Sequence, residues 1–207
     1  MKTETVKRGS SGEEVKKLQL ALSLYADGIF GSLTEEAVKE FQRSHGLTAD
    51  GVVGERTWAA LTANANGGLH KSQRTINEII VHCSATVEGK DFTVADIKRW
   101  HLQRGFSDIG YHYVIYRDGS VHEGRNINIS GAHCKGHNTH SIGVCYIGGL
   151  DVQERPKDTR TAAQREALLK LIKELKRLYP AATVHGHNEY ANKACPCFNA
   201  KAEYNAI

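Results

Sequence analysis

The spacing of apolar residues divides the chain into a helical first third and a mixed remainder. In the segment 11–25, a helical stripe is formed by Val15, Leu18, Leu22 and Tyr25. Ser11 and Glu14 have the spacing of a capping box at the start of this helix. Two more short helices are expected, one after each Asp-Gly turn at residues 27–28 and 50–51. The first third therefore predicts an all-α unit of three short helices.

An internal repeat organises this helical unit. The stretches DGIFGSLTEEAV from Asp27 and DGVVGERTWAAL from Asp50 share the pattern D-G-apolar-apolar-G-x-x-T-x-x-A-apolar. In each copy the glycines supply a tight turn, and Thr34 or Thr57 is placed to cap the helix that follows. Each copy is therefore expected to be one turn and one helix.

The remainder of the chain alternates predicted strands with predicted helices. Short apolar runs predict buried strands within NEIIVHCSAT (77–86), HSIGVCYIGG (140–149) and ATVHG (182–186). Residues 111–125 predict a hairpin around Asp118 and Gly119. Amphipathic patterns predict helices within 93–105, capped by Thr93, and within 161–180. This alternation is typical of an α/β sheet with helices on its faces.

A change in composition separates the two regions. The stretch TANANGGLHKSQ is small, polar and glycine-containing, which is typical of a linker. We therefore expect a first domain at residues 1–62, a linker at 63–73 and a second domain at 74–207.

Composition and charge exclude some classes of protein. Hydrophobic residues make up 40% and charged residues 24% of the chain, as in ordinary globular proteins, and no apolar run has the length of a membrane span. The net charge is +4, without a basic block interleaved with aromatic residues, so nucleic acid is not an expected partner. The first residues, MKTETVKRGSSGEEVKK, lack the apolar core of a secretory signal. We therefore expect synthesis in the cytoplasm without a signal peptide, and a monomer.

The stretch HGHNEYANKACPCF, residues 185–198, carries the densest candidate chemistry. Cys195 and Cys197 are too close for the usual C-x2-C zinc knuckle. The odd total of five cysteines favours free thiols or metal ligands over a disulfide scaffold. Spacing alone leaves three interpretations besides a catalytic metal site: a structural zinc site, a Cys195 nucleophile, or surface histidines with buried thiols.

A second stretch changes the balance between these interpretations. His82 stands at the end of a predicted buried strand, which is where α/β sheets place their sites. Together with His187 and Cys195 it would supply two imidazoles and one thiolate. A catalytic zinc takes three such protein ligands and keeps one position open. By residue type and spacing alone, this set is suggestive of a zinc centre.

The first third resembles the peptidoglycan-binding module of many cell-wall hydrolases. The resemblance rests on VKRGSSGEEVKKLQ, DGIFGSLTEEAVKEFQ and GLTADGVVGERTWAAL and covers about residues 6–62. It implies that peptidoglycan is the partner of this domain. The connection between Leu22 and Asp27 is shorter than is common in that module.

The remainder resembles the zinc amidases related to T7 lysozyme and the peptidoglycan recognition proteins. VHCSAT, WHLQRGFSDIGYHYVIYRDG, GAHCKGHNTHSIGVCYIGG and GHNEYANKACP occur in the order of that family, across about residues 77–205. The resemblance implies a mixed sheet flanked by helices. It also implies an N-acetylmuramoyl-L-alanine amidase, which cuts the amide between the lactyl group of muramic acid and the L-alanine of the stem peptide.

The same resemblance implies roles for individual residues. The zinc ligands would be His82, His187 and Cys195, and the catalytic pair would be Tyr111 and Lys193. His133 and Asn138 would line the substrate groove. Glu189 is expected, on general grounds, to accept a hydrogen bond from a ligand imidazole, because zinc-bound histidines commonly need such a partner. Cys145 stands where related amidases with an aspartate ligand place a glutamate, so the general base stays open.

Several alternatives remain at this stage. The other cysteines have no assigned role, and a Cys134–Cys197 bridge stays open. A hydrolase without a signal peptide would resemble an endolysin that acts on the bacterial cell wall after release or export. The competing hypotheses are a recognition protein that binds peptidoglycan without cutting it, and a peptidase that uses Cys195.

Overall fold

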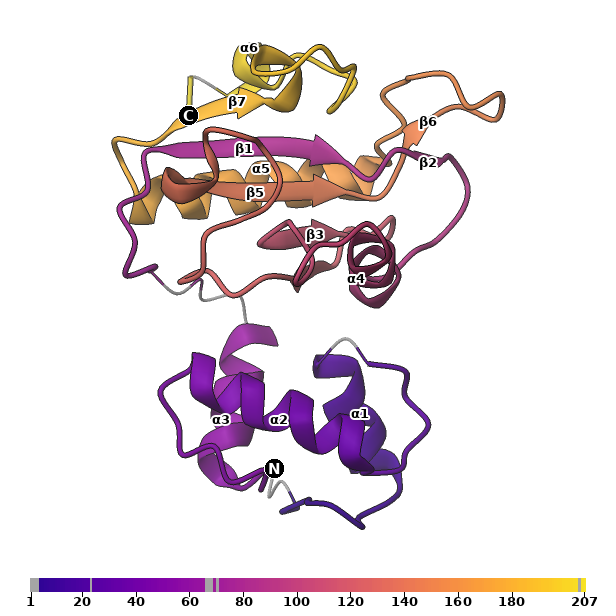
Figure 1. Cartoon of the computed structure of the whole chain (residues 1–207), viewed down its shortest axis with the longest axis vertical. Coiled ribbons are helices and arrows are strands. Elements are labelled where there is room, and N and C mark those ends of the chain that lie inside the picture. The colour runs from indigo at the N-terminus through magenta and orange to yellow at the C-terminus, as the bar shows by residue number, and fades with distance from the viewer. Residues whose placement is uncertain (1–3, 23, 66–68, 70, 205) are drawn as a thin grey trace. The chain divides into compact units, whose positions relative to one another are not determined.

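The computed structural model describes residues 4–22, 24–65, 69, 71–204 and 206–207. The chain divides into two units, Met1–Leu69 and His70–Ile207, each with its own set of internal contacts (Figure 1). None of the helices in the described ranges has both the length and the apolar character needed to cross a bilayer.

Three short helices build the first unit, as the apolar pattern predicts. They are α1 (Glu13–Ala21), α2 (Ser32–Ser44) and α3 (Glu55–Ala65). Their shared core consists of Val6, Val15, Leu18, Phe30, Val38, Val53, Trp58 and Leu61. Tyr25 was expected in the apolar stripe and is instead 88% exposed, because α1 ends before it at Ala21.

In each copy of the internal repeat, a buried glutamine bonds to the Asp-Gly turn and to the threonine that follows it. Gln42 Nε2 donates to Asp50 Oδ1 at 2.9 Å and to Thr57 Oγ1 at 3.2 Å, while its Oε1 accepts from the Gly51 N–H at 2.9 Å. Gln19 makes the matching bonds to Asp27, Thr34 and Gly28. The repeat therefore extends from the sequence pattern to its hydrogen bonds.

The expected helix caps of the first unit are wrong. Gly12 is the N-cap of α1 and Gly31 that of α2, and neither supplies a side-chain bond. Thr34 lies inside the first turn of α2, where its hydroxyl faces Gln19. Hydrogen bonds between the buried glutamine and the turn take the place of a side-chain cap. The threonine hydroxyl therefore bonds to the glutamine and does not cap the helix.

A mixed sheet forms the centre of the second unit, in the order β4-β3-β5-β1-β7. Its strands are β1 (Glu78–Cys83), β3 (Tyr113–Ile115), β4 (Val121–Glu123), β5 (Ser141–Tyr146) and β7 (Thr183–Gly186). β1 pairs in parallel with β5 and β7, β3 pairs in parallel with β5, and only the hairpin pair β3–β4 is antiparallel. Two short strands, β2 (Thr86–Val87) and β6 (Gly149–Leu150), pair beside this sheet.

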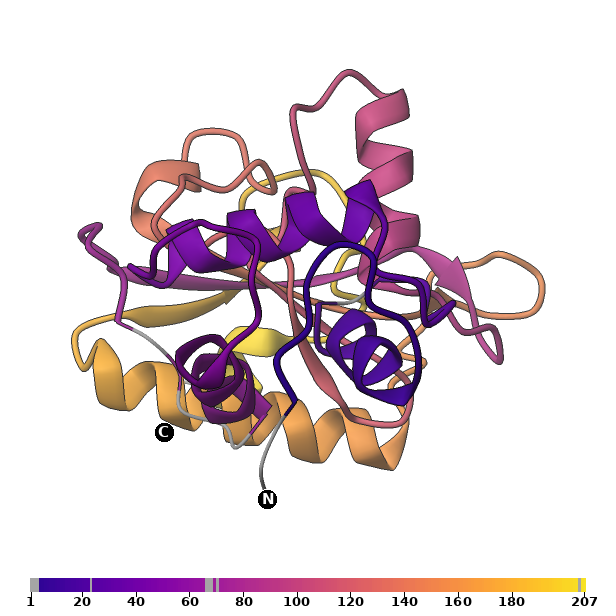
Figure 2. The ribbon, with the colours of Figure 1, turned by 90° about the horizontal axis from the view of Figure 1, so that it is seen from below.

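Helices cover both faces of the sheet. Figures 1 and 2 show α5 (Ala162–Leu178) along one face and α4 (Val94–Gln103) on the other. Both begin with a full capping box, at Thr93 and Thr161, as expected for Thr93. The last helix, α6 (Ala200–Tyr204), contacts β7. This is the mixed sheet with flanking helices that the family resemblance implies.

The segment between the two units is only partly described. The expected linker, 63–73, contains residues 66–68 and 70, which lie outside the described residues. Before them, α3 continues to Ala65, because no glycine or proline interrupts it earlier. After them, Ser72 Oγ donates to the Ile127 carbonyl at 2.8 Å and Arg74 Nε donates to the same carbonyl, so this stretch packs with the second unit.

Candidate metal centre

Strand order brings the candidate ligands together. β1 and β7 are parallel neighbours, so their carboxyl ends meet at one edge of the sheet. His82 is the second-to-last residue of β1, and His187 directly follows β7 in a short 3-10 turn, His187–Glu189. Cys195 follows on the next loop, and the peptide bond to Pro196 is cis.

These three side chains converge. One ligand atom from each of His82, His187 and Cys195 lies within 4.8 Å of the other two. Cys195 Sγ is 3.7 Å from His82 Nδ1. Zinc bonds of about 2.0–2.1 Å to nitrogen and 2.3 Å to sulfur, at tetrahedral angles, put such a pair about 3.5 Å apart. The donor set and its spacing therefore fit a tetrahedral metal ion.

The protonation states of the cluster suit ligation. Burial, followed by the nearby His133 and His187 rings and the Lys193 charge, holds the pKa of His82 well below its usual range. Burial and then the Lys193 charge also lower the pKa of His187. Both rings are therefore neutral at pH 7, which is the form that binds metals. The Cys83 backbone N–H donates to Cys195 Sγ at 3.2 Å.

A second imidazole, that of His133, contacts the His82 ring. His133, 9% exposed, places its Nδ1 3.0 Å from His82 Nε2, and its Nε2 3.3 Å from Ser141 Oγ. If His82 offers Nδ1 to a metal, its Nε2–H donates to His133 Nδ1, and His133 Nε2–H donates to Ser141. This pair of hydrogen bonds would fix the tautomer and orientation of a metal-bound imidazole. The residue expected in the substrate groove thus contacts a candidate ligand.

Tyr111 is partly buried, whereas Lys193 is exposed to solvent. The Tyr111 ring centre is 5.1 Å from that of His82. Burial, and then the nearby thiols, raise the pKa of Tyr111 well above its usual range, so its hydroxyl stays protonated. Lys193 is exposed, and its charge acts on both His82 and His187.

Asn138 and Glu189 support the backbone around the cluster. Asn138 Oδ1 accepts from the His133 and Cys134 backbone N–H groups, at 2.8 and 2.9 Å. Glu189 was expected to accept from a ligand imidazole, which is not what the structure shows. Its Oε2 is 2.9 Å from His185 Nδ1 and its Oε1 accepts from the Gly186 N–H, because the 3-10 turn directs it back along β7.

The cysteines outside the cluster form no disulfide. All five are free, and Cys145 is fully buried in β5. The bridge left open between Cys134 and Cys197 is not formed. Cys197 Sγ lies instead 3.9 Å from Cys83 Sγ.

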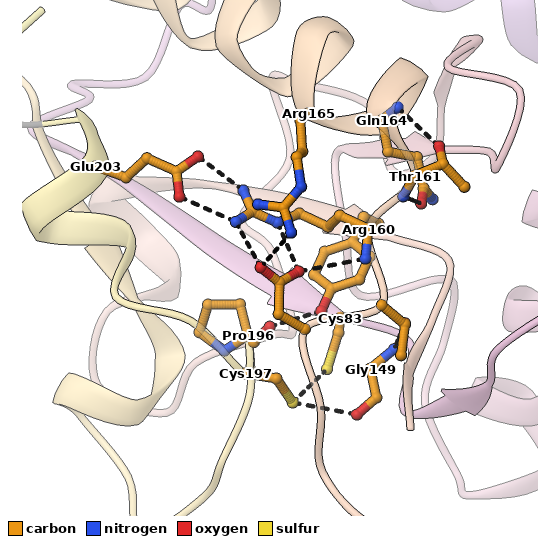
Figure 3. A network of polar contacts seen from close by, with 12 residues as sticks. Cys83, Gly149, Arg160, Thr161, Gln164, Arg165, Pro196, Cys197 and Glu203 are labelled. Carbon is orange, nitrogen blue, oxygen red and sulfur yellow. Dashed lines mark hydrogen bonds and ion pairs between the residues drawn. The ribbon is translucent and has the colours of Figure 1, made fainter. Parts of the chain in front are cut away.

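A polar network that the sequence pattern does not predict holds the turn that carries Cys195 (Figure 3). The buried Arg160 guanidinium pairs with Asp158 and Glu203, at 2.9 Å in each case, and lies 3.3 Å from the Phe198 ring centre. The Tyr146 hydroxyl donates to the Pro196 carbonyl at 2.7 Å. These residues are far apart in the sequence, so no local pattern could have revealed their meeting.

Comparisons with known proteins agree with this architecture. Residues 72–198 match the family described as N-acetylmuramoyl-L-alanine amidase, and residues 11–61 match a putative peptidoglycan binding domain. The chain is 45% identical to the endolysin of Klebsiella phage KP32, over 63% of this chain and 86% of that protein. It is 41% identical to the endolysin of Escherichia phage T7, over 63% of this chain and 87% of that protein.

Solved structures show the same fold. The amidase LysC from Clostridium intestinale is 29% identical and aligns with a TM-score of 0.54, over 63% of this chain and 82% of that one. The Drosophila peptidoglycan recognition protein LB is 28% identical, with a TM-score of 0.54, over 65% and 82%. The chain therefore belongs to the N-acetylmuramoyl-L-alanine amidase family and is a peptidoglycan hydrolase that carries a peptidoglycan-binding domain.

Proposed function

We propose that the chain cuts the amide between the muramic acid lactyl group and L-alanine with one zinc ion held by His82, His187 and Cys195. The observation that carries the proposal is the convergence of their ligand atoms within 4.8 Å. Two neutral imidazoles and one thiolate leave a net charge of +1 at the centre and one position open for substrate or water. Zinc held there supplies Lewis acidity, which activates water and polarises a carbonyl.

Tyr111 and Lys193 complete the proposed site. Because the Tyr111 hydroxyl stays protonated beside His82, it can orient the attacking water or pass a proton toward the leaving amine. The Lys193 ammonium, whose charge reaches both ligand imidazoles, can stabilise the negative charge that develops on the carbonyl oxygen.

His133 is proposed as a positioning residue. Its 3.0 Å contact with His82 Nε2 supports one orientation and one tautomer of the ligand ring, and Ser141 fixes His133 in turn. Asn138 holds the loop that carries His133 through two backbone bonds. Loss of such a partner typically weakens metal binding by about 10–100-fold without removing a ligand.

The first unit is proposed to hold the enzyme on its substrate. Its match to a putative peptidoglycan binding domain supports wall binding, and the endolysin relatives support action on the bacterial cell wall. A tethered binding module raises the local concentration of scissile bonds around the catalytic unit. A monomer would then both bind the cell wall and cleave it.

Metal stoichiometry tests the ligand set. Native mass spectrometry should find one zinc per wild-type chain and none in Cys195→Ala or His187→Ala. The matched control is Cys134→Ala, a buried cysteine outside the cluster, which should keep its zinc. His133→Ala should keep the stoichiometry but release zinc to a chelator about 10–100-fold faster. Undiminished zinc in Cys195→Ala would contradict the proposal.

A Cys195 nucleophile is the second candidate, because its sulfur lies 3.7 Å from a histidine nitrogen. A thiolate–imidazole pair of this kind can attack a carbonyl directly. Alkylation would abolish such an activity and chelation would leave it intact, whereas the zinc proposal requires sensitivity to chelation.

A further inference from the structure

Two thiols that the proposed mechanism does not use lie against each other beside the metal centre. Cys83 Sγ and Cys197 Sγ are 3.9 Å apart, although 114 positions separate the residues in the chain. Cys83 directly follows His82, and Cys197 comes two residues after Cys195. Each thiol therefore belongs to a segment that carries a candidate ligand.

The two thiols differ in access and in local structure. Cys83 is 4% exposed and lies in β1, between β5 and β7. Gly149 packs against it so closely that a Cβ at that glycine would lie 2.5 Å from the Cys83 sulfur. Cys197 is partly exposed in a turn without regular structure, and its thiol donates to the Gly149 carbonyl at 3.2 Å. Cys197 is thus the thiol that a solute can reach.

We propose that Cys83 and Cys197 are a disulfide-forming pair, closed by a low-molecular-weight disulfide oxidant, whose bond staples the His82 segment to the Cys195 segment. The sulfurs need to approach from 3.9 Å to about 2.05 Å. Cys83 is fixed in the sheet, so the approach is made by the Cys197 turn. The Cys197 thiol gives up its bond to Gly149 in the process.

The reaction is a thiol–disulfide exchange in two steps. The Cys197 thiolate attacks one sulfur of oxidised glutathione, which forms a mixed disulfide and releases one glutathione thiolate. The Cys83 thiolate then attacks the Cys197 sulfur, forms the internal bond and releases the second glutathione. The two thiol protons pass to the two glutathione thiolates. The two electrons from the cysteine pair thereby reduce one oxidised glutathione.

The bond would act on the folded state and on the metal. A cross-link between residues so distant in sequence removes much conformational freedom from the unfolded chain, so unfolding should require a higher temperature. The same bond holds the strand of His82 and the turn of Cys195 at one separation. Zinc release, which needs these segments to part, should then be slower. This second effect rests on the proposed zinc site, whereas disulfide formation does not.

The test treats the zinc-loaded full chain with oxidised glutathione, followed by alkylation, digestion and mass spectrometry. The expected result is a linked peptide pair containing Cys83 and Cys197, a higher midpoint of thermal unfolding, and zinc release to a chelator slowed about 10-fold. Cys197→Ser, whose hydroxyl can still donate to Gly149, should show none of these changes. Cys134→Ser, the matched control, should show all three.

Each contrary result has a distinct meaning. A lasting glutathione adduct on Cys197, or a disulfide that includes Cys195, would overturn the pairing. A Cys83–Cys197 bond with unchanged zinc release would overturn the stapling of the metal centre. Absence of zinc from the reduced and the oxidised chain alike would overturn the proposed metal centre and leave the disulfide pair standing.

Discussion

Burial favours the uncharged forms of the rings around the cluster. His82 and His187 are kept neutral, as metal ligands must be, while the Tyr111 hydroxyl keeps its proton. The exposed Lys193 ammonium supplies the positive charge. The cluster thus combines two neutral imidazole donors with the protonated Tyr111 hydroxyl and the Lys193 ammonium.

Replacing Tyr111 with phenylalanine tests its role apart from metal binding. The ring would still pack against His82, so zinc stoichiometry should be unchanged. The rate constant for amide cleavage should fall about 100-fold or more, because the hydroxyl proton is lost. Turnover of a soluble muropeptide and metal analysis of the same preparation provide the measurement. Full activity in Tyr111→Phe would remove the residue from the mechanism.

A buried histidine away from the ligands predicts how stability depends on pH. Burial, with the Arg74 and Arg125 charges, lowers the pKa of His112 from 6.5 to about 4. Its Nδ1 accepts from the Gly143 N–H, and its Nε2 lies 3.0 Å from the Ile129 carbonyl. Between pH 6.5 and about 4 the unfolded chain binds a proton that the folded chain does not. The stability contributed by neutral His112 is therefore complete above pH 6.5 and is lost as the pH falls through this window.

Urea unfolding at several pH values would measure this effect. The free energy of unfolding should decrease by up to about 1.4 kcal/mol per pH unit from His112 alone. His112→Gln keeps one acceptor and one donor in place, so its curve should be flatter than the wild-type curve by about that slope. Equal slopes for both proteins would show that His112 does not titrate as inferred.

The sequence predicted three candidate ligands, which the structure brings together, but not the residues that surround them. His82 was predictable because an apolar run ends beside it, and His187 and Cys195 because they fall in conspicuous motifs. The contact between His133 and His82, and the meeting of Cys83 with Cys197, depend on pairing across the whole sheet. No local pattern encodes such contacts. Glu189 shows the converse, since its motif was clear and its partner was not the expected one.

Repeated structure dominates at the scale of the elements. In each copy of the repeat in the first unit, the side chain of one glutamine bonds a helix to the Asp-Gly turn that follows it. Both glutamines are nearly inaccessible, with Gln19 at 2% and Gln42 at 1% exposure. Removing a buried group of this kind leaves its partners unpaired, which is more costly than the loss of one bond.

Gln42→Ala should therefore destabilise the first unit by about 1–3 kcal/mol. Gln19→Ala is the matched variant, and a similar loss is expected because its network is the same. Calorimetry of the full chain should show an earlier transition for the first unit and an unchanged transition for the amidase unit. A loss below about 0.5 kcal/mol in both variants, the usual size of a surface substitution, would contradict this account of the repeat.

Element types were more predictable than their order. The Thr93 cap, the amphipathic pattern of residues 161–180 and the Asp118–Gly119 turn are local signals, and the structure has the helices and hairpin in those places. The insertion of β5 between β3 and β1 is a long-range choice that the pattern does not contain. The predicted threonine caps of the first unit failed because a glutamine network recruits Thr34 and Thr57.

At the scale of the whole molecule, the chain joins an amidase unit to a unit that matches a putative peptidoglycan binding domain. The relatives that support this assignment are phage endolysins and a clostridial amidase, with recognition proteins sharing the fold. We propose that a zinc ion held by His82, His187 and Cys195 enables this chain to cut the lactyl–alanine amide.

The most direct test is digestion of purified peptidoglycan by the full chain, with a chelator and with zinc restored, followed by mass spectrometry of the products. The account predicts free stem peptides that begin with L-alanine, their loss on chelation and their return with zinc. Cleavage that ignores the chelator, or products cut within the stem peptide or the glycan, would contradict it.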